Sequence, residues 1–207
     1  MLVLVSIAQS PATVRRLRGF SLIELLLVLG VIAVLLVAAF VIYPQVRARN
    51  QANTEVTNVR AIQANVRNLY AVRGGNYYGI GAGPGTSDYG IGNQARIFPA
   101  TMNGGDFSAN VPITSSWGGE VYVWNRPAIV TPYGNVASGR SFGIAYFKVP
   151  TDVCVPMVTA LSESFLSIAV GAAGAQTEVL VANQGLNVPR LTAACQAQDV
   201  NITFTSN

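Results

Sequence analysis

The sequence predicts an α+β protein in which one long N-terminal helix, with a transmembrane half and an amphipathic half, packs on an antiparallel β-sheet. Three observations predict this fold: an uncharged apolar run from Leu25 to Ile42, a helical stripe after it, and short alternating segments between turn signals further on. The 207 residues suit one domain. Apolar residues make up 51% and charged residues 11%, which excludes a disordered chain.

The apolar run is long enough to cross a membrane as a helix. Its eighteen residues rise about 27 Å, close to the hydrocarbon thickness of a bilayer. The basic cluster of Arg15, Arg16 and Arg18 precedes the run, and the positive-inside rule keeps such a cluster in the cytoplasm. The run is therefore either a retained transmembrane helix or a secretory signal.

A cleaved signal peptide is the simpler alternative. Val37-Ala38-Ala39 is an acceptable small-residue cleavage site, and cleavage there would release a soluble secreted binding domain that begins at Phe40. Glu24 argues against it, because a signal peptide has no use for a carboxylate between its basic cluster and its apolar run. At the edge of the hydrocarbon an unpaired carboxylate costs several kcal/mol.

The segment Arg18-Gly19-Phe20-Ser21-Leu22-Ile23-Glu24, followed directly by the apolar run, resembles the processing site of type IV prepilins. The resemblance implies that prepilin peptidase cuts between Gly19 and Phe20 on the cytoplasmic face. It also implies that Phe20 is then methylated and that the apolar helix stays on the mature protein. The fold expected from the resemblance is the pilin fold.

The same resemblance implies an assembly role for Glu24, which would pair with the terminal amine at Phe20 of a neighbouring subunit. A carboxylate buried among aliphatic side chains in a filament core needs such a partner. Any register between subunits that leaves Glu24 unpaired is penalised. The pair would therefore set the geometry of the filament as well as the affinity between subunits.

The helix is expected to continue beyond the apolar run, with a bend at Pro44, and to end at Arg73 before Gly74-Gly75. One apolar face is predicted from these residues: Ala52, Val56, Val59, Ile62, Val66 and Leu69. Arg60 and Arg67 lie together on another face. A nucleic-acid patch is an alternative interpretation of the helix's arginines, but no aromatic residues interleave with them, so a solvated or subunit-facing surface is favoured.

The remainder is predicted to be a surface loop over 74–92, then strands and a short helix. The loop has glycines but no Lys-Ser/Thr after them, which excludes a P-loop. Pro150-Thr151-Asp152 predicts a helix start, with Val153, Met157, Leu161 and Phe165 on one face and Pro156 within the first turn. The predicted strands are 120–125, 128–131, 141–149, 177–182 and 200–205.

Cys154 and Cys195 are the two cysteines. An exported domain would join them in a disulfide, with two reduced buried thiols as the alternative. Two C-terminal cysteines around a variable segment resemble the disulfide-bounded region of type IV pilins, and the order of features over 141–174 resembles subclass IVb. Phe20 is instead typical of subclass IVa, and a start at Val14 would leave a short IVa-type leader.

No catalytic, metal or cofactor site is expected. The chain has no histidine, and its nine acids are scattered without ligand spacing for zinc or calcium. Three of the 13 basic residues lie in the predicted leader, so the mature chain would carry ten bases against nine acids, a net charge of +1. The basic excess therefore says little about nucleic acid.

The sequence thus predicts a structural subunit of a type IV pilus. Its expected partners are copies of itself in a helical filament, prepilin peptidase with the pilus assembly machinery, and the bacterial inner membrane before export to the cell surface. A minor pilin or a type II secretion pseudopilin is the alternative with the same N-terminus. The expected divisions are 1–19 leader, 20–44 apolar helix, 45–73 amphipathic helix and 74–207 globular part.

Overall fold

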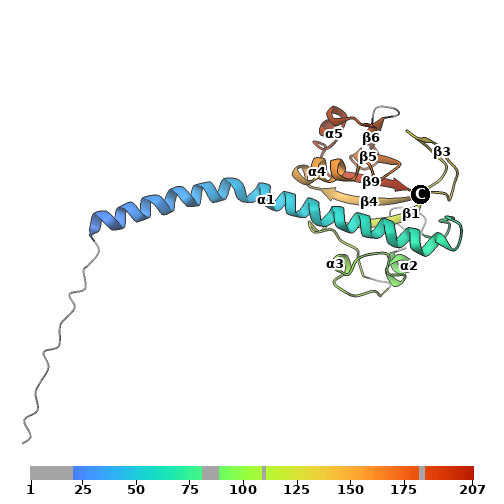
Figure 1. Ribbon diagram of the computed structural model, residues 1–207, viewed down its shortest axis with the longest axis horizontal. Helices are drawn as coiled ribbons and strands as arrows, with labels where there is room; N and C mark the ends of the chain where they lie inside the picture. Colours follow the sequence, from blue (N-terminus) through green and yellow to red (C-terminus); the bar gives the residue numbers. More distant parts are fainter. Residues whose placement is uncertain (1–20, 81–88, 109–110, 182–184) are drawn as a thin grey trace, which may run out of the picture. The chain divides into compact units, whose positions relative to one another are not determined.

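The computed structural model describes residues 21–80, 89–108, 111–181 and 185–207 (Figure 1). The chain divides into two units, Met1–Tyr43 and Pro44–Asn207. Helix α1, Leu22–Ala71, contains Pro44, so the helix continues through the proline as predicted. The first unit is described from Ser21 onward and consists there of the apolar half of α1.

The end of α1 is set by the glycine pair, two residues earlier than expected. The helix stops at Ala71 rather than at Arg73, and Gly74 and Gly75 follow with φ angles of 63° and 71°. This left-handed conformation favours glycine and terminates helices. The Gly75 N–H donates to the Tyr70 carbonyl over 3.2 Å, which closes the last turn.

The apolar face of α1 is buried as predicted from Ala52 to Val66, but the prediction for Leu69 was wrong. Leu69 is 45% exposed, whereas Tyr70 is 6% exposed and takes its place in the core. Ala52 and Tyr70 lie five turns apart at about 3.6 residues per turn, so the true helical period selects Tyr70.

A five-stranded antiparallel sheet, in the order β1-β4-β9-β5-β6, forms the centre of the second unit. Its strands are β1 Val121–Asn125, β4 Phe142–Val149, β5 Ser167–Gly171, β6 Thr177–Glu178 and β9 Val200–Ser206. Two short hairpins lie outside it: β2 Ile129–Thr131 with β3 Gly134–Val136, and β7 Leu180–Val181 with β8 Gly185–Leu186.

One face of this sheet packs on the second half of α1. Gln63 and Arg67 of α1 both donate to the Ser206 hydroxyl of β9, at 2.9 and 3.0 Å. Tyr146 of β4 belongs to the same buried core as the apolar face of α1. Because side chains alternate along a strand, Ala145 and Thr203 lie on the opposite face.

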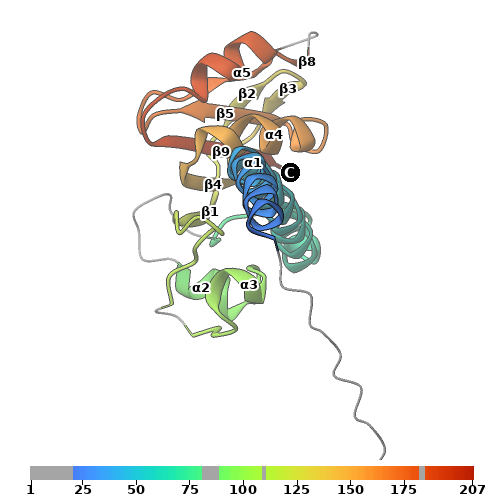
Figure 2. The ribbon, with the colours of Figure 1, turned by 90° about the vertical axis from the view of Figure 1, so that its left-hand side faces the viewer.

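Helix α4, Thr151–Leu161, lies beside α1, and its last turn accepts a hydrogen bond from Arg60 through the Ala160 carbonyl. Figure 2 shows α5, Val188–Ala194, near β5, and α2, Tyr89–Gln94, with α3, Ala100–Asn103, on the side of β1. Helix α2 corrects the prediction of an irregular loop over 74–92; residues 81–88 of that loop lie outside the described residues.

Two details of α4 differ from the prediction. Pro156 is the sixth residue of the helix, beyond its first turn, and Phe165 is buried but follows the helix end. A proline there removes one helical hydrogen bond and costs about 3 kcal/mol or more in an isolated helix. The buried side chains of α4 offset this cost; they are Val153, Cys154, Met157, Val158 and Leu161.

Strands β1, β2, β4 and β9 confirm four of the five predicted segments, and the fifth is divided. Residues 177–178 pair with β5, and residues 180–181 pair with β8. The change of sheet occurs at Val179, whose N–H donates to Ile168 O and whose carbonyl accepts the N–H of Asn187. Strand β5 itself was not among the predicted strands.

Candidate assembly surface

The predicted processing residues lie outside the described part of the chain. They are Arg15, Arg16, Arg18, Gly19 and Phe20. The described structure begins at Ser21, whose carbonyl accepts the N–H of Leu25 over 3.2 Å and so belongs to the first turn of α1. Glu24 is therefore the predicted assembly residue whose surroundings the structure describes.

The apolar half of α1 exposes its side chains all round. Its most apolar 18-residue window has a mean hydropathy of 3.4, and none of that window is buried. By length and composition this helix can cross a membrane. A soluble monomer rarely exposes an apolar patch of more than a few hundred Å², so lipid or other protein must cover this surface.

Glu24 is the one charged residue between Leu22 and Val46. It lies in the first turn of α1 and its side chain is exposed. The helix macrodipole stabilises an acid at this end by about 0.3–1 kcal/mol, which is much less than the cost of burying an unpaired carboxylate in an apolar environment. Any environment that covers the apolar half must therefore supply a cation or a strong donor near Glu24.

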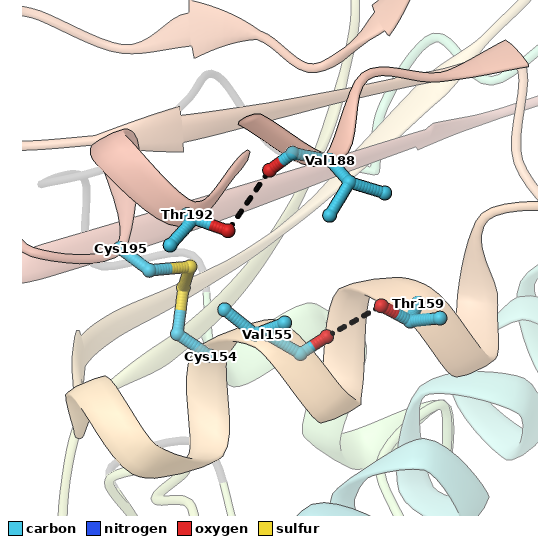
Figure 3. The surroundings of a disulfide bond; sticks show 6 residues. All are labelled: Cys154, Val155, Thr159, Val188, Thr192 and Cys195. Atoms are coloured by element: carbon cyan, nitrogen blue, oxygen red, sulfur yellow. Dashed lines mark hydrogen bonds between the residues drawn. A yellow bond between two sulfur atoms is a disulfide. The ribbon is translucent and has the colours of Figure 1, made fainter. Parts of the chain in front are cut away.

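The disulfide joins Cys154 of α4 to Cys195, which directly follows α5, with a Cα–Cα distance of 5.8 Å (Figure 3). Both cysteines are buried, and the bond closes a sequence separation of 41 residues. The predicted disulfide is thus confirmed. Thr159 and Thr192 of the same two helices donate their hydroxyls to the carbonyls of Val155 and Val188, within their own helices.

Glu55 is a buried acid that the sequence analysis did not single out. Its side chain is 1% exposed, and its Oε1 and Oε2 accept the Ser116 N–H at 2.6 Å and the Asn58 amide at 3.1 Å. Burial and the negative charge of Glu55 raise the pKa of the Tyr146 hydroxyl well above its usual value. The helical spacing contained the signal, since Glu55 is three residues after Ala52 and four before Val59.

Arg60 and Arg67 are exposed but bonded within their own subunit. Arg60 donates to the Ala160 carbonyl over 3.1 Å, and Arg67 donates from Nε to the Asn207 carbonyl over 2.6 Å. Ala160 lies in the last turn of α4, where a cation is favourable for the helix dipole. Both arginines are exposed, as expected for a solvated or subunit-facing surface, and these contacts add a structural role within the subunit.

No group of three or more residues that could hold a metal ion occurs among the described residues.

The family model described as PilS N terminal matches residues 49–207, more than three quarters of the chain. The model described as the prokaryotic N-terminal methylation motif matches residues 14–40. No curated protein matches the chain.

Two of the solved structures similar to the chain are crystal structures of pilins. The type IV b pilin from Salmonella typhi is 21% identical, with a TM-score of 0.48, over 75% of this chain and 99% of that one. TcpA, a type IV pilin from the Vibrio cholerae El Tor biotype, is 15% identical, with a TM-score of 0.49, over 78% of this chain and 99% of that one.

Proposed function

The chain belongs to the PilS family of type IV pilins, and we propose that prepilin peptidase cuts it between Gly19 and Phe20 before it polymerises through α1. The family membership confirms the predicted resemblance to type IV pilins of the IVb kind. As a pilin, the protein is a structural subunit of a type IV pilus and not an enzyme. The observation that carries the assembly mechanism is the uncovered apolar half of α1 with Glu24 as its one charge.

Processing between Gly19 and Phe20 assigns residues 1–19 to a leader. The cut removes Arg15, Arg16 and Arg18, which orient the precursor with its N-terminus in the cytoplasm. It leaves a free amine at Phe20, four residues before Glu24. This amine is then methylated. The N-terminal methylation motif over residues 14–40 supports this assignment.

Polymerisation transfers the apolar half of α1 from lipid to a filament core. Lipid tails are as apolar as leucine side chains, so the transfer gains little from the hydrophobic effect itself. Close packing between helices and polar pairing in an apolar environment must supply the free energy. The pair between the Glu24 carboxylate and the Phe20 amine of the next subunit is the polar pair that this segment offers.

The subunit pool before assembly is proposed to reside in the bacterial inner membrane, with the globular part of 74–207 on the outer side. The Cys154–Cys195 disulfide supports that placement, because disulfides persist in oxidising compartments such as the periplasm. Prepilin peptidase and the pilus assembly machinery are the proposed partners besides other copies of the chain.

The test is the substitution Glu24→Ala in a strain that lacks its own copy of the protein. The variant is expected to be processed normally and to yield no sheared surface filaments, because its apolar helix no longer has a partner for the Phe20 amine. Glu24→Gln, which keeps the shape but loses the charge, is expected to lower the filament yield at least ten-fold.

Glu163→Ala is the matched control, since Glu163 is an exposed acid in the globular part. It should leave both processing and filament yield unchanged. Normal filaments from Glu24→Ala would refute the pairing role of Glu24, and an unprocessed precursor in that variant would assign Glu24 to processing instead.

A further inference from the structure

A pocket of about 540 Å³ lies on the face of the sheet opposite α1. Trp124 of β1, Ala145 of β4 and Thr203 of β9 line it, and strand alternation places all three on that face. The loop between β5 and β6 contributes Gly174 and Gln176. The volume lies in the range typical of small-molecule sites, about 300–1,000 Å³.

The floor of the pocket is buried and its rim is open. Trp124, Ala145, Asn201 and Thr203 are buried, whereas the loop residues at the rim are exposed. The Trp124 indole requires the glycine opposite it, because a Cβ on Gly143 would lie 2.8 Å from an indole carbon. The floor is thus shaped by close packing between Trp124 and the backbone of Gly143.

Arg126 supplies the one cationic side chain of the lining, which contains no acid. Its guanidinium carbon lies 5.8 Å from the centre of the Trp124 ring. Its Nε is shielded from solvent and has no hydrogen-bond acceptor among the described residues. A buried donor without an acceptor is unfavourable, and a ligand oxygen at this position would satisfy it.

The backbone holds Arg126 in position at the end of β1. Its N–H donates to the Ser141 carbonyl over 2.9 Å, and its carbonyl accepts the Gly139 N–H over 3.1 Å. Burial lowers the pKa of the guanidinium, and the charge of Glu178 opposes that shift. The side chain stays charged, since an arginine keeps its proton in proteins.

Amide side chains complete the polar lining. The Oδ1 of Asn201 accepts the Lys148 N–H, and the Oε1 of Gln176 accepts the Thr203 hydroxyl. These two bonds orient both amides through their oxygens, and neither amide nitrogen donates to another described residue. Asn125 adds a third amide, and the half-buried ring of Phe147 adds an apolar wall.

We propose that this pocket binds an acidic monosaccharide, with Arg126 holding its carboxylate and the amides of Gln176 and Asn201 binding its hydroxyls. A guanidinium matches a carboxylate through two parallel N–H···O bonds. Neighbouring sugar hydroxyls both donate and accept, which suits amide side chains, and Phe147 offers an apolar surface to the C–H groups of the ring. Phosphate fits less well, because the lining offers a single cation.

The test is a titration of the full-length mature chain in detergent micelles. Calorimetry measures the affinity, and NMR records the indole N–H signals of the two tryptophans, Trp117 and Trp124. Glucuronate is the probe, with glucose, propionate and inorganic phosphate as comparisons. We expect glucuronate to bind at least ten-fold more tightly than each of the three others. It should shift the Trp124 signal more than the signal of Trp117, whose ring lies against Tyr146 on the α1 side.

Arg126→Gln should weaken glucuronate binding at least ten-fold. Gln176→Ala changes an exposed residue at the rim and should weaken glucuronate binding at least three-fold. Arg73→Gln is the matched control for net charge and should bind like the parent, because Arg73 is exposed and lies outside the lining. Absence of glucuronate binding, equal binding by Arg126→Gln and the parent, or tighter binding of phosphate would each overturn the proposal.

Discussion

Glu55 is an acid on the buried face of α1, where a charge is costly unless it is bonded. Its two oxygens accept one backbone N–H, from Ser116, and one side-chain amide, from Asn58, whose own Oδ1 accepts the Thr101 hydroxyl. The carboxylate therefore ties α1 to the segments around Thr101 and Ser116, which are far from it in sequence. Its role is to fix those segments on the helix.

Glu55→Ala is expected to lower the free energy of unfolding by about 2–3 kcal/mol, because it leaves two donors without an acceptor and opens a gap in the core. Guanidinium unfolding of the full chain in micelles, followed by tryptophan fluorescence, measures the change. The exposed control Glu163→Ala should stay within about 0.5 kcal/mol of the parent. Equal stability of both variants would show that Glu55 does not hold these segments.

Tyr146→Phe is expected to change stability in the opposite direction. The Tyr146 hydroxyl is buried without a hydrogen bond of good geometry and lies close to the charge of Glu55. Removing an unbonded buried hydroxyl saves its desolvation cost, so the variant should gain between zero and about 1 kcal/mol. The same unfolding experiment checks this, and a loss of more than about 1 kcal/mol would mean that the hydroxyl is bonded after all.

Sequence reasoning found some of these residues and missed others for a physical reason. Glu24 stands out because a charge beside a long apolar run is visible in the sequence alone. Arg126 looks like any surface arginine, since its significance comes from the burial of Nε against Trp124 and from neighbours contributed by β9 and the β5–β6 loop. Such surroundings follow from strand order, which the sequence analysis did not predict.

Among the elements, the disulfide joins α4 to the end of α5. Strands β5 and β6 and the β7–β8 hairpin lie between the two cysteines in the sequence. The disulfide's loop of about 40 residues predicts a stabilisation of about 4 kcal/mol from loop-closure entropy. α5 is only seven residues long, too short to be stable as an isolated helix, so it depends on such a link and on packing.

The double variant Cys154→Ser/Cys195→Ser is expected to unfold with a free energy about 2–4 kcal/mol lower than that of the oxidised parent. Thiol counting on the denatured parent should find no free thiol. This result distinguishes the disulfide from the alternative of two reduced, buried thiols. Two reactive thiols in the denatured parent, or an unchanged unfolding midpoint in the variant, would contradict the stabilising role.

The strands show which elements alternation can predict. β9 alternates apolar and polar residues in sequence, whereas Val121 to Trp124 of β1 form a continuous apolar run between turn signals; both strands were predicted. β5 lies inside the sheet with both faces buried, and its sequence Ser-Ile-Ala-Val-Gly places small residues on one face, so it has little polar contrast. The segment after β5 pairs with one sheet before Val179 and with another after it. The available hydrogen-bond partners determine this change, and the residues of the segment itself do not predict it.

At the scale of the whole molecule, the chain carries two kinds of surface in its two units. The first unit presents an apolar helix with a single acid, and the second presents a folded, disulfide-linked domain. Processing between Gly19 and Phe20 would lower the net charge from +4 to +1, so we expect the electrostatic repulsion between copies to be small. A nearly neutral domain on an apolar helix suits packing against identical copies.

The intact mass of the mature chain, taken from membranes and from sheared filaments, tests processing and assembly most directly. We expect a mass that matches residues 20–207 with one added methyl group at Phe20 and one disulfide between Cys154 and Cys195. A chain that begins at Phe40 would instead indicate a secreted domain cut by signal peptidase. A chain that still carries Arg15 would contradict processing, and with it the assembly mechanism built on the Phe20 amine.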